Sequence, residues 1–161
     1  MQSTKAKIQT LDQLLAKVQA WRDKGNKIVF TNGCFDILHL GHVDYLERSK
    51  AEGDVLVVGI NSDESVKRLK GDERPLQNQE SRCRVIAALG CVDAVVMFGE
   101  DTPLHLISAI GPDVLVKGAD YTAEQVVGAK EVVSRGGKLV LIPFVEGFST
   151  TRIVNRMKQN P

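Results

Sequence analysis

The chain has 161 residues, of which 43% are hydrophobic and 25% are charged, and its formal net charge at pH 7 is +1. This length fits one globular domain, and the low net charge gives no general attraction to nucleic acid or to an acidic membrane. No apolar run approaches the roughly 20 residues that cross a membrane, and the polar N-terminus lacks the apolar core of a signal peptide. We therefore expect a cytoplasmic protein that binds neither nucleic acid nor membrane.

Hydrophobic periodicity and turn residues predict helices that alternate with strands. A helix over residues 11–24, capped by Thr10, comes first. Then follow a strand over 27–31, a helix over 41–51, a strand over 54–60, helices over 62–69 and 78–89, a strand over 94–98, a helix over 103–110 capped by Thr102, a strand over 114–117, a helix over 125–135, a strand over 138–142 and a helix over 150–158.

This alternation predicts an α/β fold: a doubly wound, Rossmann-like, five-stranded parallel sheet with helices on both faces, in a single domain. Residues 1–25 are expected to form a helical segment that packs on the domain formed by residues 26–161. In such sheets, ligands bind at the carboxyl ends of the strands, where the strand order reverses. The loops that follow strands are therefore the places to search for functional residues.

The loop after the first predicted strand, TNGCFDILHLGH at positions 31–42, holds the densest set of candidates. Gly33 would let a phosphate approach the backbone closely. His39 and His42 lie three residues apart at the start of a helix, so both imidazoles share one face, and Gly41 would leave space for a ligand there. Two such donors suit nucleotidyl transfer, because negative charge builds up when a phosphate oxygen attacks the α-phosphorus of a nucleoside triphosphate.

Several alternatives stay open for this loop. The two histidines could be structural, or they could belong to a zinc site, although zinc needs three or four ligands and His105 is the remaining histidine. Asp36 is a turn residue, a Mg²⁺ ligand or a group that orients His39. Cys34 is either a reactive thiol or a small packed residue.

Hydroxyl side chains precede the last predicted helix, in the segment GFSTTRI at 147–153. Ser149, Thr150 and Thr151 could cap that helix or bind a phosphate, because hydroxyls and free N–H groups meet at a helix start.

A mixed charge run, KRLKGDERP at 67–75, is either a solvated loop or a segment that folds over an anionic substrate. Lys70 and Arg74 are its candidate site residues. Arg82 lies near the start of a helix, where the dipole disfavours a cation, and this position hints at an anionic partner.

Two further strand ends carry polar residues. Lys117, Gly118 and Asp120 follow one strand and form either a simple glycine turn or a wall of a nucleotide site. Asn61 and Asp63 follow another strand, where they could reach an acceptor substrate or cap the next helix.

Taken together, these segments resemble the cytidylyltransferase-like nucleotidyltransferases, whose H-x-G-H signature contacts the triphosphate. The resemblance implies catalytic roles for His39, His42, Lys70 and Arg82. It implies nucleotide contacts by Thr31, Asn32, Gly33, Phe35, Asp36, His39, Gly41, His42, Lys117, Gly118, Asp120, Ser149, Thr150 and Thr151, and acceptor contacts by Asp36, Asn61, Asp63, Arg74 and Arg82.

Within this family, the motifs above, with EDTPLHLI at 100–107 and PDVLVKGADY at 112–121, are similar to the adenylyltransferases that make ADP-heptose. The resemblance implies ATP and a heptose 1-phosphate as substrates, Mg²⁺ held mainly by the triphosphate, a homodimer, and a product used in lipopolysaccharide core or surface-glycan synthesis. The length suggests a stand-alone form, because a fused sugar kinase would not fit.

Two other functions are weighed against this one. In glycerol-3-phosphate cytidylyltransferases, an arginine usually stands where this chain has Phe144, and a methionine where it has Lys117. A nucleotide-binding module without catalysis would need neither both histidines nor the hydroxyl cluster, and here the two occur together.

Overall fold

The structure of the chain, a computed structural model, describes residues 3–159. The strands are β1 (Ile8–Gln9), β2 (Ile28–Gly33), β3 (Val55–Asn61), β4 (Ala94–Phe98), β5 (Val114–Gly118) and β6 (Lys138–Ile142). The helices are α1 (Thr4–Lys7), α2 (Leu11–Arg22), α3 (Leu40–Lys50), α4 (Asp63–Lys70), α5 (Gln79–Ala87), α6 (Leu104–Ile110), α7 (Ala129–Ser134) and α8 (Thr150–Gln159), with a 3₁₀ turn, η1, at Ala123–Gln125.

The strands form one parallel sheet in the order β1-β4-β3-β2-β5-β6. The sheet has six strands, so the predicted number of five is wrong. The extra strand, β1, pairs Ile8 with Val95 and Gln9 with Val96 at the sheet edge, and two residues are too few to show a periodic pattern. From β2 the chain builds outward first through β3 and β4, then through β5 and β6, so the order reverses between β2 and β5.

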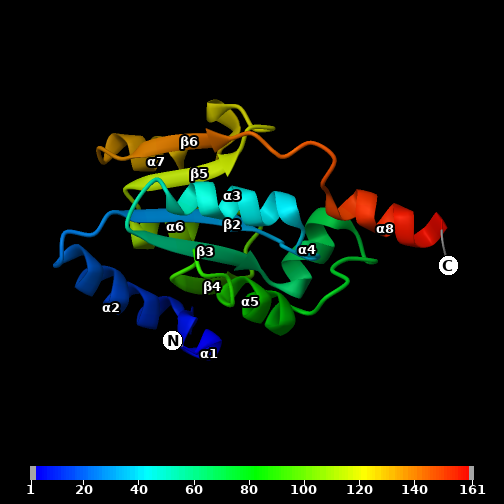
Figure 1. Cartoon of the computed structure of the whole chain (residues 1–161). Helices are drawn as coiled ribbons and strands as arrows, with labels where there is room; N and C mark the ends of the chain where they lie inside the picture. The colour runs from blue at the N-terminus through cyan, green and yellow to red at the C-terminus, as the bar shows by residue number, and fades with distance from the viewer. Residues whose placement is uncertain (1–2, 160–161) are drawn as a thin grey trace.

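Helices cover both faces of the sheet, as Figure 1 shows. On one face, α2, α6 and α7 pack on the sheet around Leu14, Val18 and Ile107. On the other face, α3 and α5 pack around Leu46 and Ile86. Burial of apolar surface on both sides stabilises the sheet and explains why β3 is buried along its whole length. The prediction of a single α/β domain is confirmed.

Three helix starts test the sequence reading directly. The Thr10 side chain accepts a hydrogen bond from the Gln13 N–H in a capping box, so that N-cap is confirmed. Helix α6 begins at Leu104 with Pro103 as N-cap, so the prediction of Thr102 as N-cap is wrong. The helix predicted over 125–135 is interrupted before α7, because Gly128 adopts a left-handed backbone with φ of +85°.

The last helix, α8, extends away from the body of the molecule in Figure 1 and contains no buried residue. Within residues 3–159, no helix is long and apolar enough to cross a membrane.

Candidate active site

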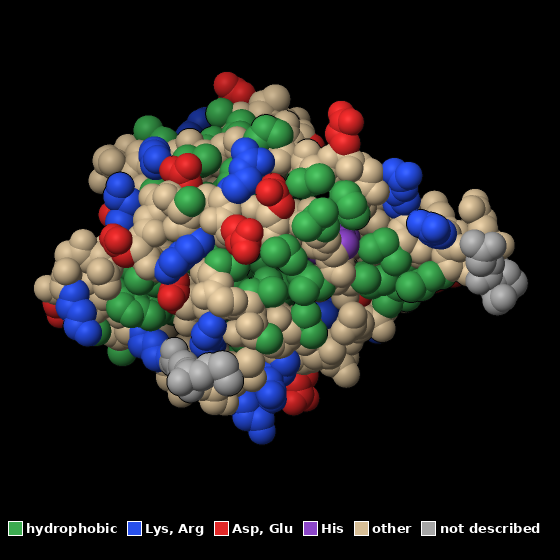
Figure 2. Space-filling model, in the orientation of Figure 1, with side chains coloured by type: hydrophobic (Ala, Val, Ile, Leu, Met, Phe, Trp, Pro, Cys, Tyr) green, Lys and Arg blue, Asp and Glu red, His purple; other side chains and the backbone are tan. Residues whose placement is uncertain are grey.

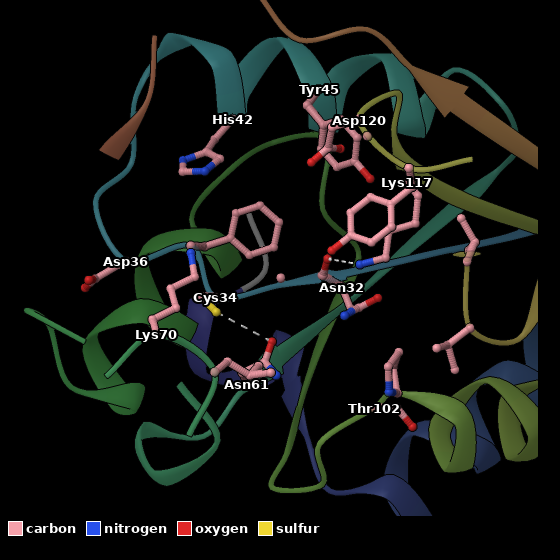
Figure 3. A pocket seen from close by; sticks show the side chains of 18 of the residues that line it. Asn32, Cys34, Asp36, His42, Tyr45, Asn61, Lys70, Thr102, Lys117 and Asp120 are labelled. Carbon is pink, nitrogen blue, oxygen red and sulfur yellow. Dashed lines mark hydrogen bonds between the residues drawn. The ribbon is translucent and has the colours of Figure 1, made fainter. Parts of the chain in front are cut away.

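A cleft of about 490 Å³ opens at the carboxyl ends of the strands, where the strand order reverses (Figure 3). This is the position expected for a ligand site in a doubly wound sheet. The cleft brings together residues predicted from five separate segments: Asn32, Gly33, Phe35, Asp36, His42, Asn61, Lys70, Lys117, Gly118, Asp120 and Thr150. Thr31, His39, Gly41, Asp63, Arg74, Arg82, Ser149 and Thr151 are predicted residues that do not line it.

The two histidines of the motif stack face to face at the start of α3. The ring centroids of His39 and His42 are 3.8 Å apart, with an angle of 20° between the ring planes. Each Nδ1 atom is buried and has no hydrogen-bond partner within residues 3–159. Burial, followed by the proximity of His39, lowers the pKa of His42 to about 4, and burial also lowers the pKa of His39. Both shifts favour the neutral form of the imidazole.

The backbone around the histidines is shaped by close contacts between motif side chains. A Cβ atom on Gly41 would lie 3.1 Å from the His39 ring, so the space beside Gly41 holds this imidazole, not the ligand expected from the sequence. Phe35 has a φ of +46°, an uncommon backbone conformation for a residue with a side chain. This turn directs the Phe35 ring edge-on toward His42, with centroids 5.1 Å apart.

Asp36 is an anchor for the loop that precedes α5. The residue is 3% exposed, and its carboxylate accepts hydrogen bonds from the Arg74 Nε at 2.7 Å and from the backbone N–H groups of Leu76 and Gln77. Burial alone would raise the pKa of Asp36, but these donors outweigh it and hold the pKa below the usual value. In Figure 3 the carboxylate points away from the other labelled side chains.

A Mg²⁺ ion would not be held well by Asp36, because both carboxylate oxygens already accept hydrogen bonds from the chain. Residues 3–159 contain no group of three or more histidine, cysteine or acidic side chains that could hold a metal. The zinc alternative therefore gains no support from the arrangement of these side chains.

Arg82 is fully buried beneath the motif loop, with all its bonds made to the protein. Its guanidinium donates to the Cys34 carbonyl at 2.7 Å, to the Gln77 carbonyl at 3.0 Å and to the Asp63 carboxylate at 2.8 Å. The side chain is 0% exposed. A buried cation needs such partners, and the anionic one is Asp63 of the chain itself. This geometry positions the motif loop.

Lys70 ends α4 and reaches the cleft from the side opposite α3. It lies close enough to His42 and Cys34 to lower the pKa of both groups, although burial raises the pKa of the Cys34 thiol overall. The Cys34 Sγ is 3.9 Å from the Asn61 Oδ1, and the Asn61 amide donates to the Ser65 hydroxyl. Cys34 therefore lines the cleft, and Lys70 is a cation well placed for an anionic ligand.

Lys117, at the end of β5, is held over the end of β2. Its Nζ donates to the Asn32 backbone carbonyl at 3.3 Å and lies 5.4 Å from the centre of the Tyr121 ring. Burial lowers the pKa of Lys117, and nearby Asp120 opposes this shift. Next to it, a Cβ atom on Gly118 would lie 2.3 Å from the Phe144 ring, so a larger residue there would displace this ring.

The three hydroxyls before and within α8 are separated by the structure. Thr150 lines the main cleft. The Ser149 hydroxyl accepts a hydrogen bond from the Arg152 N–H at 3.1 Å, as a helix cap does. Thr151 lies in a surface groove with Lys70 and Arg74.

Several lining residues were missed by sequence reasoning. The Tyr45 hydroxyl lies 2.7 Å from the Thr31 hydroxyl and completes the wall on the α3 side. Thr102 lines the cleft in place of capping a helix, and Gln125 and Val126 close the far side. No local motif marks these residues, because the fold alone brings them to the end of the sheet.

Comparison with known proteins finds a matching family and similar sequences. The sequence model of the cytidylyltransferase-like family matches residues 30–156. "Bifunctional protein HldE" of Geotalea uraniireducens is 56% identical over 153 residues, and that of Methylobacillus flagellatus is 57% identical over 151. These matches cover 95% and 94% of this chain, whereas the chain spans 31% of the length of each relative.

Two solved structures share the fold. The lipopolysaccharide core biosynthesis protein from Thermoplasma volcanium superposes with a TM-score of 0.61 at 31% identity, covering 75% of this chain and 98% of that chain. The pantoate-beta-alanine ligase from Francisella tularensis has a TM-score of 0.62 at 18% identity, covering 94% of this chain and 76% of that one, and shows the fold alone. The match of the family's sequence model to residues 30–156, together with the stacked histidines at the strand-order reversal, shows that the chain belongs to the cytidylyltransferase-like family.

Proposed function

We propose that the chain is an adenylyltransferase that transfers AMP from ATP to a heptose 1-phosphate, forming ADP-heptose and pyrophosphate. The observation that carries the proposal is the stacked pair of His39 and His42, beside a cleft at the start of α3. The motif resemblance to the ADP-heptose-forming enzymes and the identity to the HldE proteins support the choice of substrates.

In the proposed reaction, a phosphate oxygen of the sugar phosphate attacks the α-phosphorus of ATP. The bond from that phosphorus to the oxygen bridging to the β-phosphate breaks, and pyrophosphate leaves with the electron pair. A neutral imidazole donates one hydrogen bond, so His39 and His42 can each bind a phosphate oxygen on which charge develops. Lys70 supplies a positive charge on the opposite side of the cleft.

Two more roles follow from the positions of the remaining residues. Thr150 faces the cleft from the start of α8 and is proposed to contact the nucleotide phosphates. Mg²⁺ would enter bound to the triphosphate as part of the substrate, because both carboxylate oxygens of Asp36 already accept hydrogen bonds. Asp36 and Arg82 are proposed to position the motif and the loop around Arg74 without touching substrate.

The family resemblance also leads us to propose a homodimer. Exposed apolar side chains gather around the histidine visible on the face shown in Figure 2, near the point where the C-terminal helix leaves the body. Leu40 is 53% exposed and Phe148 45%. Analytical ultracentrifugation across a concentration series tests the proposal, and a single monomeric species at all concentrations contradicts it.

The test of the function is pyrophosphate release with Mg²⁺, crossing ATP and CTP against heptose 1-phosphate and glycerol 3-phosphate. We expect release only with ATP and heptose 1-phosphate. Release with CTP and glycerol 3-phosphate would keep the mechanism and replace the substrates. Nucleotide binding without release in any combination, including a wider panel of sugar phosphates, would favour a non-catalytic binding module.

A further inference from the structure

Side-chain alternation along the strands divides the cleft into two parts. The Thr31 hydroxyl meets Tyr45 of α3, whereas Phe30 belongs to the hydrophobic cluster under α2 and α6. Successive side chains of a strand point to opposite faces, so Asn32 lies on the α6 side, together with Phe30. Leu115 belongs to that same cluster, and the alternation places Lys117 on the α6 side of β5. Two residues assigned to the nucleotide by resemblance therefore face away from the histidines.

The α3 side of the cleft carries the features that suit a nucleotide. His42 lines the cleft there, stacked on His39, and Thr150 lines it from α8. Phe144 contributes an exposed aromatic ring, with its centroid 6.3 Å from that of Tyr45, and an exposed ring offers a stacking surface for a base. The α3 side therefore offers contacts for both the phosphates and the base of a nucleotide.

The α6-side pocket is defined here by Asn32, Lys117, Thr102, Gln125 and Val126. Figure 3 shows Asn32, Lys117 and Thr102 on the same side of the view, with His42 and Lys70 on the other. Val126 gives this pocket an apolar wall beside its polar groups.

The polar groups of the α6-side pocket are not all satisfied by the protein. The Asn32 Oδ1 atom is buried and has no hydrogen-bond partner in the part of the chain from residue 3 to 159. A buried acceptor without a partner is costly unless a ligand supplies the donor. Beside it, the Lys117 ammonium has three donors and uses one on the Asn32 carbonyl.

The Asn32 Oδ1 acceptor and the Lys117 Nζ donor lie on the same side of the cleft. Together they suit a hydroxyl group, which both donates and accepts hydrogen bonds. A sugar ring offers adjacent hydroxyls for these groups and apolar C–H edges for the Val126 wall. In-line transfer also requires the attacking oxygen and the departing pyrophosphate to lie on opposite sides of the α-phosphorus. The two substrates must therefore approach from different parts of the cleft.

We propose that the α6-side pocket binds the hydroxyl-bearing part of the sugar phosphate, and that Asn32 and Lys117 select this acceptor. The inference rests on the proposed function, and it moves both residues from the nucleotide to the acceptor.

The test measures binding of the two substrates separately in Asn32→Ala and Lys117→Met, with Lys130→Met, an exposed lysine of α7, as control. Calorimetry gives the affinity for ATP, and then the affinity of heptose 1-phosphate for protein saturated with a non-hydrolysable ATP analogue. We expect each site variant to weaken heptose 1-phosphate binding about tenfold or more, as loss of a hydrogen bond to a charged group does, with ATP affinity within about twofold of wild type.

Two results would overturn the assignment: weaker ATP binding with unchanged sugar phosphate binding, or no change in either. Failure of the proposed function looks different, because the wild-type protein would then bind ATP but not heptose 1-phosphate. In that case the ATP titration still tests the assignment of the α6-side pocket. A tenfold loss of ATP affinity in Lys117→Met would assign this pocket to the nucleotide.

Discussion

The motif loop at 31–42 and the C-terminal segment at 143–159 both carry phosphate-binding signatures, yet the structure builds them in opposite ways. The motif loop is tied to the core by the buried Arg82 and through Asp36, which anchors the loop before α5. In the C-terminal segment, α8 buries no residue, and its start is held by the Ser149 cap.

The difference suggests two roles: the motif loop holds its groups in fixed positions, and α8 contacts the substrate from outside. Groups that must bind charge as it develops gain from a fixed geometry, because no reorganisation is then needed during the reaction. A helix that contacts the substrate from outside, by contrast, takes its stabilisation mainly from the ligand. The comparison therefore predicts that changes under the motif loop affect folding, whereas changes in α8 affect binding.

The largest expected effect is on stability, from Arg82→Met. Removing the guanidinium leaves two carbonyls and the part-exposed Asp63 without their partner, at a cost of about 3 kcal/mol, the lower end for a broken buried pair. Thermal unfolding should show a fall in Tm of roughly 10 °C. Arg156→Met, on exposed α8, is the matched control and should melt like wild type. An unchanged Tm with a raised KM would instead make Arg82 a substrate-binding residue.

The next effect is on turnover, from His39→Ala and His42→Ala. Each variant loses one donor to the developing charge, and we expect a decrease in kcat of at least about 100-fold, or about 3 kcal/mol. Pyrophosphate release with saturating substrates measures it, and the Tm shows whether the fold is retained. Near wild-type rates in both variants would contradict the mechanism.

A smaller effect is expected from ending the chain after Ser149, which removes α8 and Thr150. Because α8 buries no side chain, the Tm should change by no more than about 2 °C, a shift that corresponds to less than about 1 kcal/mol. ATP affinity should fall about tenfold, or about 1.4 kcal/mol. The single substitution Thr150→Val should reproduce part of this loss. A large fall in Tm would show that α8 belongs to the core, against the contrast drawn above.

The last expected effect is a pH dependence of stability. His42 has a pKa of about 4 in the folded chain against an ordinary value of 6.5, so the unfolded chain binds more protons between these values. Stability should therefore decrease as the pH falls from about 6.5 toward 4. The Asp36 contribution is lost mainly below its ordinary pKa of 3.8, so it adds little in most of this range.

Denaturant unfolding at several pH values measures this dependence. His42→Asn removes the titrating group and should make the decrease shallower. An equal slope in both proteins would mean that another group titrates in this range.

Much of the fold could be read from local pattern. Apolar runs such as 54–60 marked the buried strands, and Thr10 marked a helix start as its N-cap. The short strand Ile8–Gln9 could not be seen, because only its pairing with β4 makes it a strand. Thr102 was misread because a threonine before a proline looks like a cap, whereas the chain carries it into the cleft.

The sequence by itself determined the parallel α/β fold and the position of the two histidines at a helix start, because both follow from residues close together in the chain. Tertiary structure alone decided which polar groups are free. Asp36 and Arg82 look like ligand-binding residues in the sequence, but partners 38 and 19 residues away satisfy them. The Asn32 amide oxygen, by contrast, has no partner among residues 3–159. Hydrogen bonding in the interior depends on which distant segments meet there, and local spacing does not encode that.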